Sequence, residues 1–254
     1  MAFIEFNALS VHLGGSFSAK FFAPEMDKLK LNDGEHVKRY PVLWLIHSDG
    51  GTAMDWCSTP IEAAAVKHGI FVVAVDVQHS LCTDMAYGPA FETFLKEELP
   101  GICRKVVPIS SDPAFNWIGG VGTGAYGAMK LAIQHPDVFS RAFALDGWLD
   151  LQKVGQKLKA GVPTGIPHTL ASYEAVFGDA DSFMGSKHDI FTLASGVTSG
   201  EFYIACSETS QRLDEYTVFA SLLKDRVTFV KTPQAYDDKA CYFTLPPAVE
   251  WACR

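Results

Sequence analysis

The chain has 254 residues, of which 48% are hydrophobic and 20% are charged. This length and composition allow a substantial core, so we expect one α/β domain over residues 1–254. The formal net charge of −8, without a long run of Lys or Arg, argues against nucleic acid or an anionic membrane as partner. We expect a small organic ligand or an ester instead.

The cysteines and the N-terminus indicate the compartment. Six cysteines are spread along the chain with no C-x-x-C pair, which is typical of reduced, packed thiols. The first residues include Glu5 and have no basic region before an apolar run, unlike a signal peptide. No apolar stretch reaches membrane-spanning length. We therefore expect a cytoplasmic protein.

The N-terminal third changes pattern once. Residues 3–9 and 16–23 alternate apolar and polar side chains, which predicts an antiparallel hairpin with its turn at 13–15. After a polar loop at 30–39, short and wholly apolar runs begin, as in parallel strands that are buried on both faces. These runs lie at 40–48, 69–77, 115–121, 139–147, 201–207 and 226–233.

Helical segments separate the apolar runs. Their apolar residues recur at three- and four-residue spacing, at 60–69, 90–106, 124–136 and 212–225. The alternation predicts a doubly wound, mostly parallel sheet. It lapses between Trp148 and Ser195, where we expect an inserted cap over the carboxyl ends of the strands, the edge at which open α/β sheets bind ligands. The cap aromatics Tyr173, Phe177 and Phe183, with Met184, are interpreted as local core.

The segment "NWIGGVGTGAYGAMKLAIQHPDVF" at 116–139 has the order strand, glycine turn, helix. This is how α/β-hydrolases present a nucleophilic serine in a G-x-S-x-G elbow. The central residue here is Gly122, which has no hydroxyl. Because the elbow backbone is strained for a residue with a Cβ, glycine relieves strain where no nucleophile is needed.

Several motifs together resemble the esterase D and tributyrin esterase branch of the α/β-hydrolases, which includes the S-formylglutathione hydrolases. They are "YPVLWLIHSDGGTAMDW", "TDMAYG", "EELP", the elbow and "FYIACS", and they cover nearly the whole chain. The resemblance implies an α/β-hydrolase fold and hydrolysis of carboxylic or thiol esters by Ser, Asp and His in that order. We expect no cofactor and no metal.

The positions that the resemblance assigns to the triad carry other residues. The nucleophile position is Gly122, the acid position is Ser210 and the base position is Tyr236, with Glu208 and Asp214 left open as acids. None of the eight histidines follows Ser210, so a triad in family order cannot form. We expect the three vestigial positions to border one concavity beneath the cap.

The oxyanion loop also departs from the family pattern. In the family a His-Gly pair precedes the residue whose N–H binds the oxyanion, whereas here His47 is followed by Ser48 and Asp49. A carboxylate at Asp49 would oppose the charge that develops there. Thr123 keeps the second backbone donor. We expect His47 and Ser48 to border the pocket.

Two other chemistries are possible for residues near the expected pocket. His47 and His79 could bind a metal or form an acid/base pair with nearby carboxylates, namely Asp49, Asp76 and Asp84, but no metal-ligand spacing is present, which favours structural roles. Cys57 and Cys82 could be nucleophiles, but neither lies on the elbow, so packed or exposed thiols are favoured.

The sequence thus leaves two functions open. The first is a non-catalytic member of the family that binds a small molecule or a protein. The alternative is a working carboxylesterase, for short-chain acyl esters or thioesters, with a rearranged site. A homo-oligomer is compatible with either.

Overall fold

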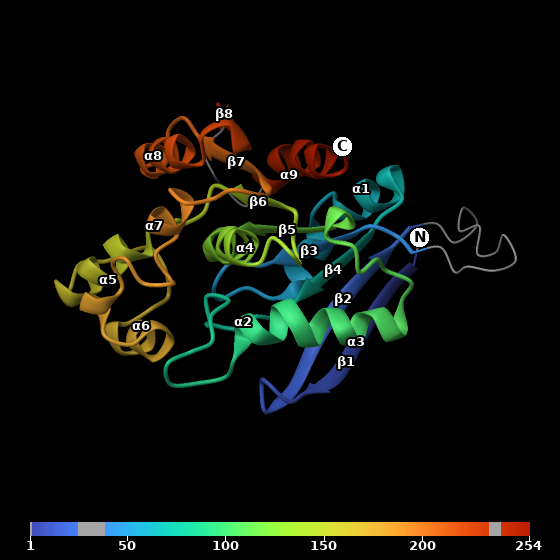
Figure 1. The fold of residues 1–254 in the computed structure, drawn as a ribbon, viewed down its shortest axis with the longest axis horizontal. Coiled ribbons are helices and arrows are strands. Elements are labelled where there is room, and N and C mark those ends of the chain that lie inside the picture. Colours follow the sequence, from blue (N-terminus) through green and yellow to red (C-terminus); the bar gives the residue numbers. More distant parts are fainter. Residues whose placement is uncertain (1, 25–38, 234–239) are drawn as a thin grey trace, which may run out of the picture.

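A computed structural model describes residues 2–24, 39–233 and 240–254. Within them eight strands form one sheet in the order β1-β2-β4-β3-β5-β6-β7-β8 (Figure 1). The strands are β1 Ala2–Ser10, β2 Gly15–Ala23, β3 Val42–Ile46, β4 Phe71–Val75, β5 Asn116–Val121, β6 Arg141–Leu145, β7 Glu201–Ser207 and β8 Val227–Thr232.

The two strand patterns of the sequence correspond to two kinds of pairing. β1 pairs with β2, and β2 with β4, in antiparallel register, while β3 to β8 are parallel. Every residue of β3 and β4 is buried, as expected for strands covered on both faces. The predicted mostly parallel sheet with an N-terminal hairpin is confirmed.

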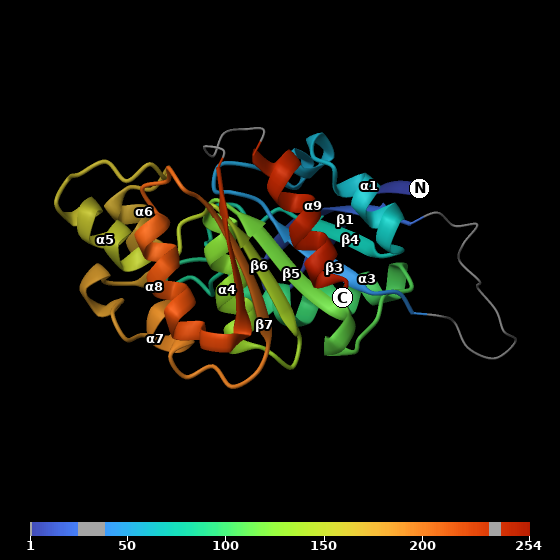
Figure 2. The ribbon, with the colours of Figure 1, turned by 90° about the horizontal axis from the view of Figure 1, so that it is seen from above.

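Helices cover both faces of the sheet, and each face has its own apolar core. One core includes residues of α4, the central helix that follows β5, and the other includes residues of α1 and α9 (Figure 2). The helices are α1 Ile61–His68, α2 Phe91–Thr93, α3 Leu99–Val106, α4 Thr123–Gln134, α5 Leu151–Lys159, α6 Leu170–Phe177, α7 Ile190–Ala194, α8 Leu213–Leu223 and α9 Ala240–Ala252, with short helices η2 Ala53–Ser58, η3 Phe94–Glu98, η4 Pro113–Phe115, η5 Ala180–Ser182 and η6 Lys224–Arg226.

Helix α9 lies outside the helices that the sequence pattern predicts. Pro246 and Pro247 lie inside it, and prolines usually interrupt a helix. Its apolar positions nevertheless follow helical spacing, because Leu245, Val249 and Ala252 are all buried against the sheet face. The helix is therefore stabilised by packing rather than by local propensity.

The predicted cap, Trp148–Ser195, contains α5, α6, η5 and α7, which lie together at one side of the molecule (Figure 1). Tyr173, Phe177 and Phe183 are buried and pack ring against ring, as expected. Met184 is 71% exposed, so assigning it to the core was wrong: it lies in the turn after Phe183, outside the ring cluster.

Candidate ligand site at the elbow

The elbow backbone has the form that the sequence predicts. β5 ends at Val121, α4 begins at Thr123, and Gly122 joins them with φ 56° and ψ −125°. That backbone region is strained for residues with a Cβ. The turn also packs tightly, since a Cβ on Gly124 would lie 2.4 Å from the carbonyl oxygen of Ile46.

The space beside Gly122 belongs to Ser48. A Cβ built on Gly122 would lie 2.1 Å from Ser48 Oγ and 2.6 Å from Ser48 Cβ. In the resembling family a glycine follows the histidine and the elbow carries the serine. Here the small residue and the serine have exchanged places, and the Ser48 side chain takes the volume that a nucleophile side chain would need.

The expected oxyanion donor is already bonded within the protein. The backbone N–H of Asp49 donates to Oγ1 of Thr123, the first residue of α4. A substrate oxygen would have to displace that hydroxyl before it could accept the same N–H. The Thr123 side chain therefore occupies the donor that an oxyanion would need.

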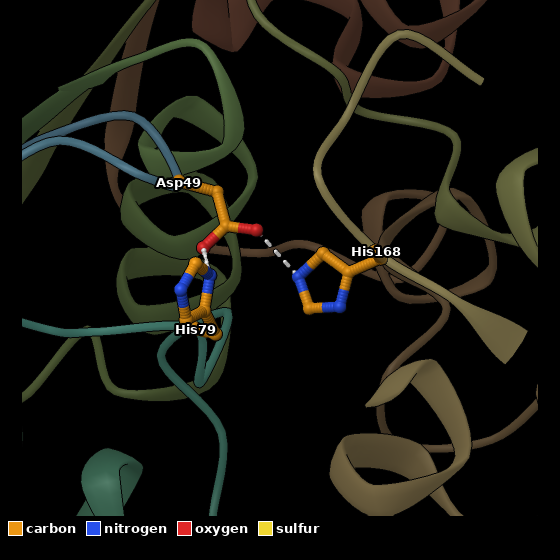
Figure 3. Close-up of side chains that lie close together, drawn as sticks. All are labelled: Asp49, His79 and His168. Atoms are coloured by element: carbon orange, nitrogen blue, oxygen red, sulfur yellow. Dashed lines mark hydrogen bonds and ion pairs between the residues drawn. The ribbon is translucent and has the colours of Figure 1, made fainter. Parts of the chain in front are cut away.

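The Asp49 carboxylate lies between two histidine side chains. Its Oδ1 lies 2.6 Å from His79 Nδ1 and its Oδ2 lies 2.6 Å from His168 Nε2 (Figure 3). Asp49 follows β3, His79 follows β4, and His168 comes from the cap just before α6. Sequence reasoning missed His168, because nothing in the local pattern links the cap to the loop after β3.

His47 has a structural role at the end of the sheet. It is 2% exposed, and its Nε2 accepts a 3.0 Å hydrogen bond from the Val77 N–H. Nδ1 therefore carries the proton and donates to the Ser48 carbonyl at 2.7 Å. His47 thus joins the chain after β3 to the chain after β4 and fixes the backbone on which Ser48 and Asp49 stand.

The remaining candidate carboxylates are hydrogen-bonded within the protein, and the two candidate cysteines do not have the pKa of a nucleophile. Asp76 accepts from the Ala53 N–H at the start of η2, and Asp84 accepts from Thr93. Burial raises the pKa of Cys82 to about 12, and burial also raises the pKa of Cys57. Neither cysteine therefore has the lowered pKa of a nucleophilic thiol.

The acid position is linked to a second carboxylate. Ser210 Oγ donates to Asp146 Oδ1 at 3.1 Å, and Arg212 Nη2 donates to the same oxygen at 2.9 Å. Asp146 is buried directly after β6, with φ 41°. A carboxylate is therefore present beside Ser210, but an arginine is paired with it. The open alternatives, Glu208 and Asp214, are both exposed.

The contacts join the elbow side of the site to the acid side. The Trp148 N–H donates to the Gly122 carbonyl at 3.1 Å, and the Arg212 guanidinium lies 4.6 Å from the centroid of the Trp148 ring. Through Arg212 this chain of contacts continues to Asp146 and Ser210. The base position, Tyr236, lies outside the described residues, so its place in the expected concavity stays a prediction.

A cavity of about 470 Å³ opens beside this chain of contacts. Trp148, Lys153 and Lys157 line it from the cap side, and Gln211 and Arg212 line it from the start of α8. Arg212 Nε is buried and has no hydrogen-bond partner among the described residues. The volume is that of a small-molecule site.

Comparisons with known proteins give a consistent result. The family model "Esterase" matches residues 28–194. A relative described as an acetyl esterase, from Caldicellulosiruptor saccharolyticus, is 28% identical over 203 residues, which is 76% of this chain and 73% of the relative. Among the described residues, no helix is long and apolar enough to cross a membrane.

Solved structures share the fold. The fluorophosphonate-binding serine hydrolase F of Staphylococcus aureus superposes with a TM-score of 0.86 at 23% identity, over 100% of this chain and 98% of that one. An S-formylglutathione hydrolase from the same organism gives 0.83 at 23% identity, over 100% and 99% of the two chains. At this identity the likeness establishes the α/β-hydrolase fold alone.

Proposed function

The chain belongs to the esterase family, and from that premise we propose that it no longer hydrolyses esters and instead binds a small organic acid or ester in the cavity lined by Trp148 and Arg212, beside the elbow. The observation that carries the proposal is the exchange at the elbow. Gly122 has no nucleophilic side chain, and Ser48 occupies the volume in which one would stand.

Each other part of the hydrolytic machinery supports the same conclusion. All eight histidines precede Ser210, so a base in the family position is missing from the sequence. The Asp49 N–H is bonded to Thr123 rather than open to an oxyanion. The carboxylate beside the acid position, Asp146, is paired with Arg212 and is not available to orient an imidazole.

The cavity beside Trp148 and Arg212 supports ligand binding. Its volume suits a ligand of metabolite size, and the indole face provides an apolar wall. Arg212 and Lys157 line the cavity and bring cationic donors to it, which favours a ligand with a carboxylate or carbonyl oxygen.

One observation favours a second function, an esterase with a displaced nucleophile. The Ser48 hydroxyl stands where the elbow serine would begin, and the next residue, Asp49, contacts two histidines. An unassisted hydroxyl is a poor nucleophile, however. The hydrogen bonds among the described residues include none between Ser48 Oγ and a histidine, so the base that this mechanism requires is not engaged.

Turnover of p-nitrophenyl acetate separates the two functions. We expect the wild type to give only the background of a non-specific protein, equal to that of Ser48→Ala. Ser16→Ala, at an exposed serine of β2, is the matched control. Saturable turnover that Ser48→Ala abolishes and Ser16→Ala retains would overturn the proposal in favour of the displaced nucleophile.

Ligand binding is tested separately with a panel of short carboxylic acids and their methyl esters. The measurement is the increase in the melting temperature of the protein when each compound is added. We expect members of the panel to stabilise the wild type and the control Lys105→Gln, at an exposed lysine of α3 outside the cavity, but not Arg212→Gln. Equal responses of the wild type and Arg212→Gln would contradict the assignment of the cavity.

A further inference from the structure

We propose that Asp49, His79 and His168 bind one divalent transition-metal ion of the zinc class. Each side chain offers one ligand atom, and these three atoms all lie within 4.8 Å of one another. The inference does not depend on whether the chain hydrolyses esters, because it rests on the contacts of these three side chains alone (Figure 3).

The donor set suits such an ion. A carboxylate oxygen with two imidazole nitrogens is a common arrangement for zinc and related divalent metals, which favour nitrogen and oxygen donors. The ligands come from three separate segments: the loop after β3, the loop after β4 and the cap. A bound ion would therefore join the cap to the sheet. The two already approach each other there, since a Cβ added to Gly50 would lie 3.7 Å from Cγ of Pro167 in the cap.

Two of the ligand atoms have no other use. The Asp49 and His168 side chains are 1% and 0% exposed, and Asp49 Oδ2 and His168 Nε2 have no hydrogen-bond partner among the described residues. They lie 2.6 Å apart without the angles of a hydrogen bond. Buried polar atoms are rarely left unsatisfied, because each costs free energy. A cation between them would satisfy both.

The hydrogen bonds of His168 prepare its Nε2 for a metal. Ser172 Oγ donates to the Thr169 carbonyl at 3.0 Å, so the serine oxygen is left to accept the Nδ1–H of His168 at 3.2 Å. With the proton on Nδ1, Nε2 presents a lone pair toward Asp49 Oδ2. Two lone pairs facing each other repel. A partner that fixes the imidazole tautomer in this way is typical of metal-binding histidines.

The geometry requires only a small adjustment. Ligand atoms about 2.0–2.1 Å from a tetrahedral zinc ion are about 3.3 Å apart. With Asp49 Oδ2 as the ligand atom, its 2.6 Å contact with His168 Nε2 must open by about 0.7 Å to reach that spacing, and His79 Nδ1 must turn from Asp49 Oδ1 toward the ion. The His79 side chain is 60% exposed on its loop, which leaves it room to move. Three protein ligands leave one position for water or for a donor atom of a bound small molecule.

Isothermal titration with Zn²⁺ tests the site. We expect the wild type to bind one ion per chain, and His79→Gln and Asp49→Asn to bind roughly a hundredfold more weakly, as expected when one of few ligands is lost. Ser172→Ala should weaken binding about 10–100-fold by releasing His168. The matched control is His12→Gln, at an exposed histidine of the N-terminal hairpin turn, which should bind as the wild type does.

Two results of the titration would contradict the zinc site. If the wild type takes up no zinc, or if His79→Gln and Asp49→Asn bind it as tightly as His12→Gln does, the three residues form an ion-pair cluster and the proposal fails. His79 is mostly exposed, so its variant keeps the fold, which circular dichroism verifies. Because binding is read as heat and stoichiometry, the outcome is independent of the ester assay.

Discussion

Two clusters of polar side chains lie beside helix α4, and they differ in how completely their buried atoms are paired. In the structural cluster, Lys130 Nζ contacts Glu92 Oε2 at 2.6 Å and Thr83 Oγ1 at 2.9 Å, while His135 Nε2 contacts Glu92 Oε1 at 3.0 Å. In the elbow cluster of Asp49, His79 and His168, two buried atoms have no hydrogen bond among the described residues.

The difference separates stability from function. Lys130 is fully buried within α4, and the Glu92 carboxylate beside it neutralises its charge and accepts its hydrogen bond. Such a closed network fixes the helix to the segment that carries Glu92 and leaves nothing for a ligand. In the elbow cluster, Asp49 Oδ2 and His168 Nε2 are buried without a hydrogen bond among the described residues, which is the state expected of a site that binds an ion.

The largest effect is expected where the closed cluster is broken. Lys130→Met should lower the free energy of unfolding by about 3–5 kcal/mol, because Glu92 would remain buried without its cation. Zinc affinity should not change. Urea denaturation measures the loss, and adding Glu92→Gln should restore much of it; a Lys130→Met variant as stable as the wild type would contradict the structural assignment.

Acid should weaken the same cluster in a defined range. Burial acts to raise the pKa of Glu92, but hydrogen bonds and charge from His135 and Lys130 prevail and lower it to about 2, from an ordinary value of 4.5. A lowered folded-state pKa gives stability that is complete above pH about 4.5 and is lost as the pH falls toward 2. Denaturation curves across this range should show the decline in the wild type, and a smaller one in the Lys130→Met/Glu92→Gln variant.

Gly122→Ser perturbs the elbow. We expect a loss of about 2–4 kcal/mol, because the new Cβ meets both a strained backbone and the Ser48 side chain. Adding Ser48→Gly should recover roughly half, since only the contact with Ser48 is relieved. Denaturation of the two single variants and the double variant forms the cycle. Strict additivity would show that the two residues do not share one volume.

The same variants bear on activity. Gly122→Ser, alone or with Ser48→Gly, should not hydrolyse p-nitrophenyl acetate, since no histidine follows Ser210 to accept the proton. Adding Ser210→Asp and Tyr236→His is a weaker route to activity than the sequence alone indicates. An aspartate at 210 would face Asp146, which Ser210 now contacts at 3.1 Å.

The smallest effect is expected from the metal. At ten times its dissociation constant, Zn²⁺ should stabilise the wild type by about 1.4 kcal/mol, because it binds the folded chain alone. Lys130→Met should gain the same increment, whereas Asp49→Asn should gain none. Thermal denaturation with and without Zn²⁺ measures this, and equal stabilisation of Asp49→Asn would assign the effect to surface ions.

The sequence predicted what depends on local pattern. Apolar runs located the six strands of the parallel part, and the glycine spacing located the elbow and its missing nucleophile, Gly122. Helix α9 was missed because Pro246 and Pro247 argue against a helix in the local sequence. Packing of its apolar residues against the sheet outweighs that local preference.

Which side chains meet at the site could not be predicted from the local sequence pattern. His168 lies far from Asp49 in the sequence, and the volume shared by Ser48 and Gly122 depends on how two loops approach each other. The pairing of Asp146 with Arg212 likewise joins the end of one strand to the start of a helix elsewhere in the chain. These are tertiary contacts for which a single sequence carries no periodic signal.

Fluorophosphonate labelling followed by intact-mass measurement tests most directly whether the elbow of this chain carries a working nucleophile. Fluorophosphonates react with activated serines, so we predict that the wild-type chain keeps its unmodified mass while a serine esterase in the same tube is labelled. A single adduct on the wild-type chain, absent from Ser48→Ala, would show that Ser48 has replaced Gly122 as a working nucleophile.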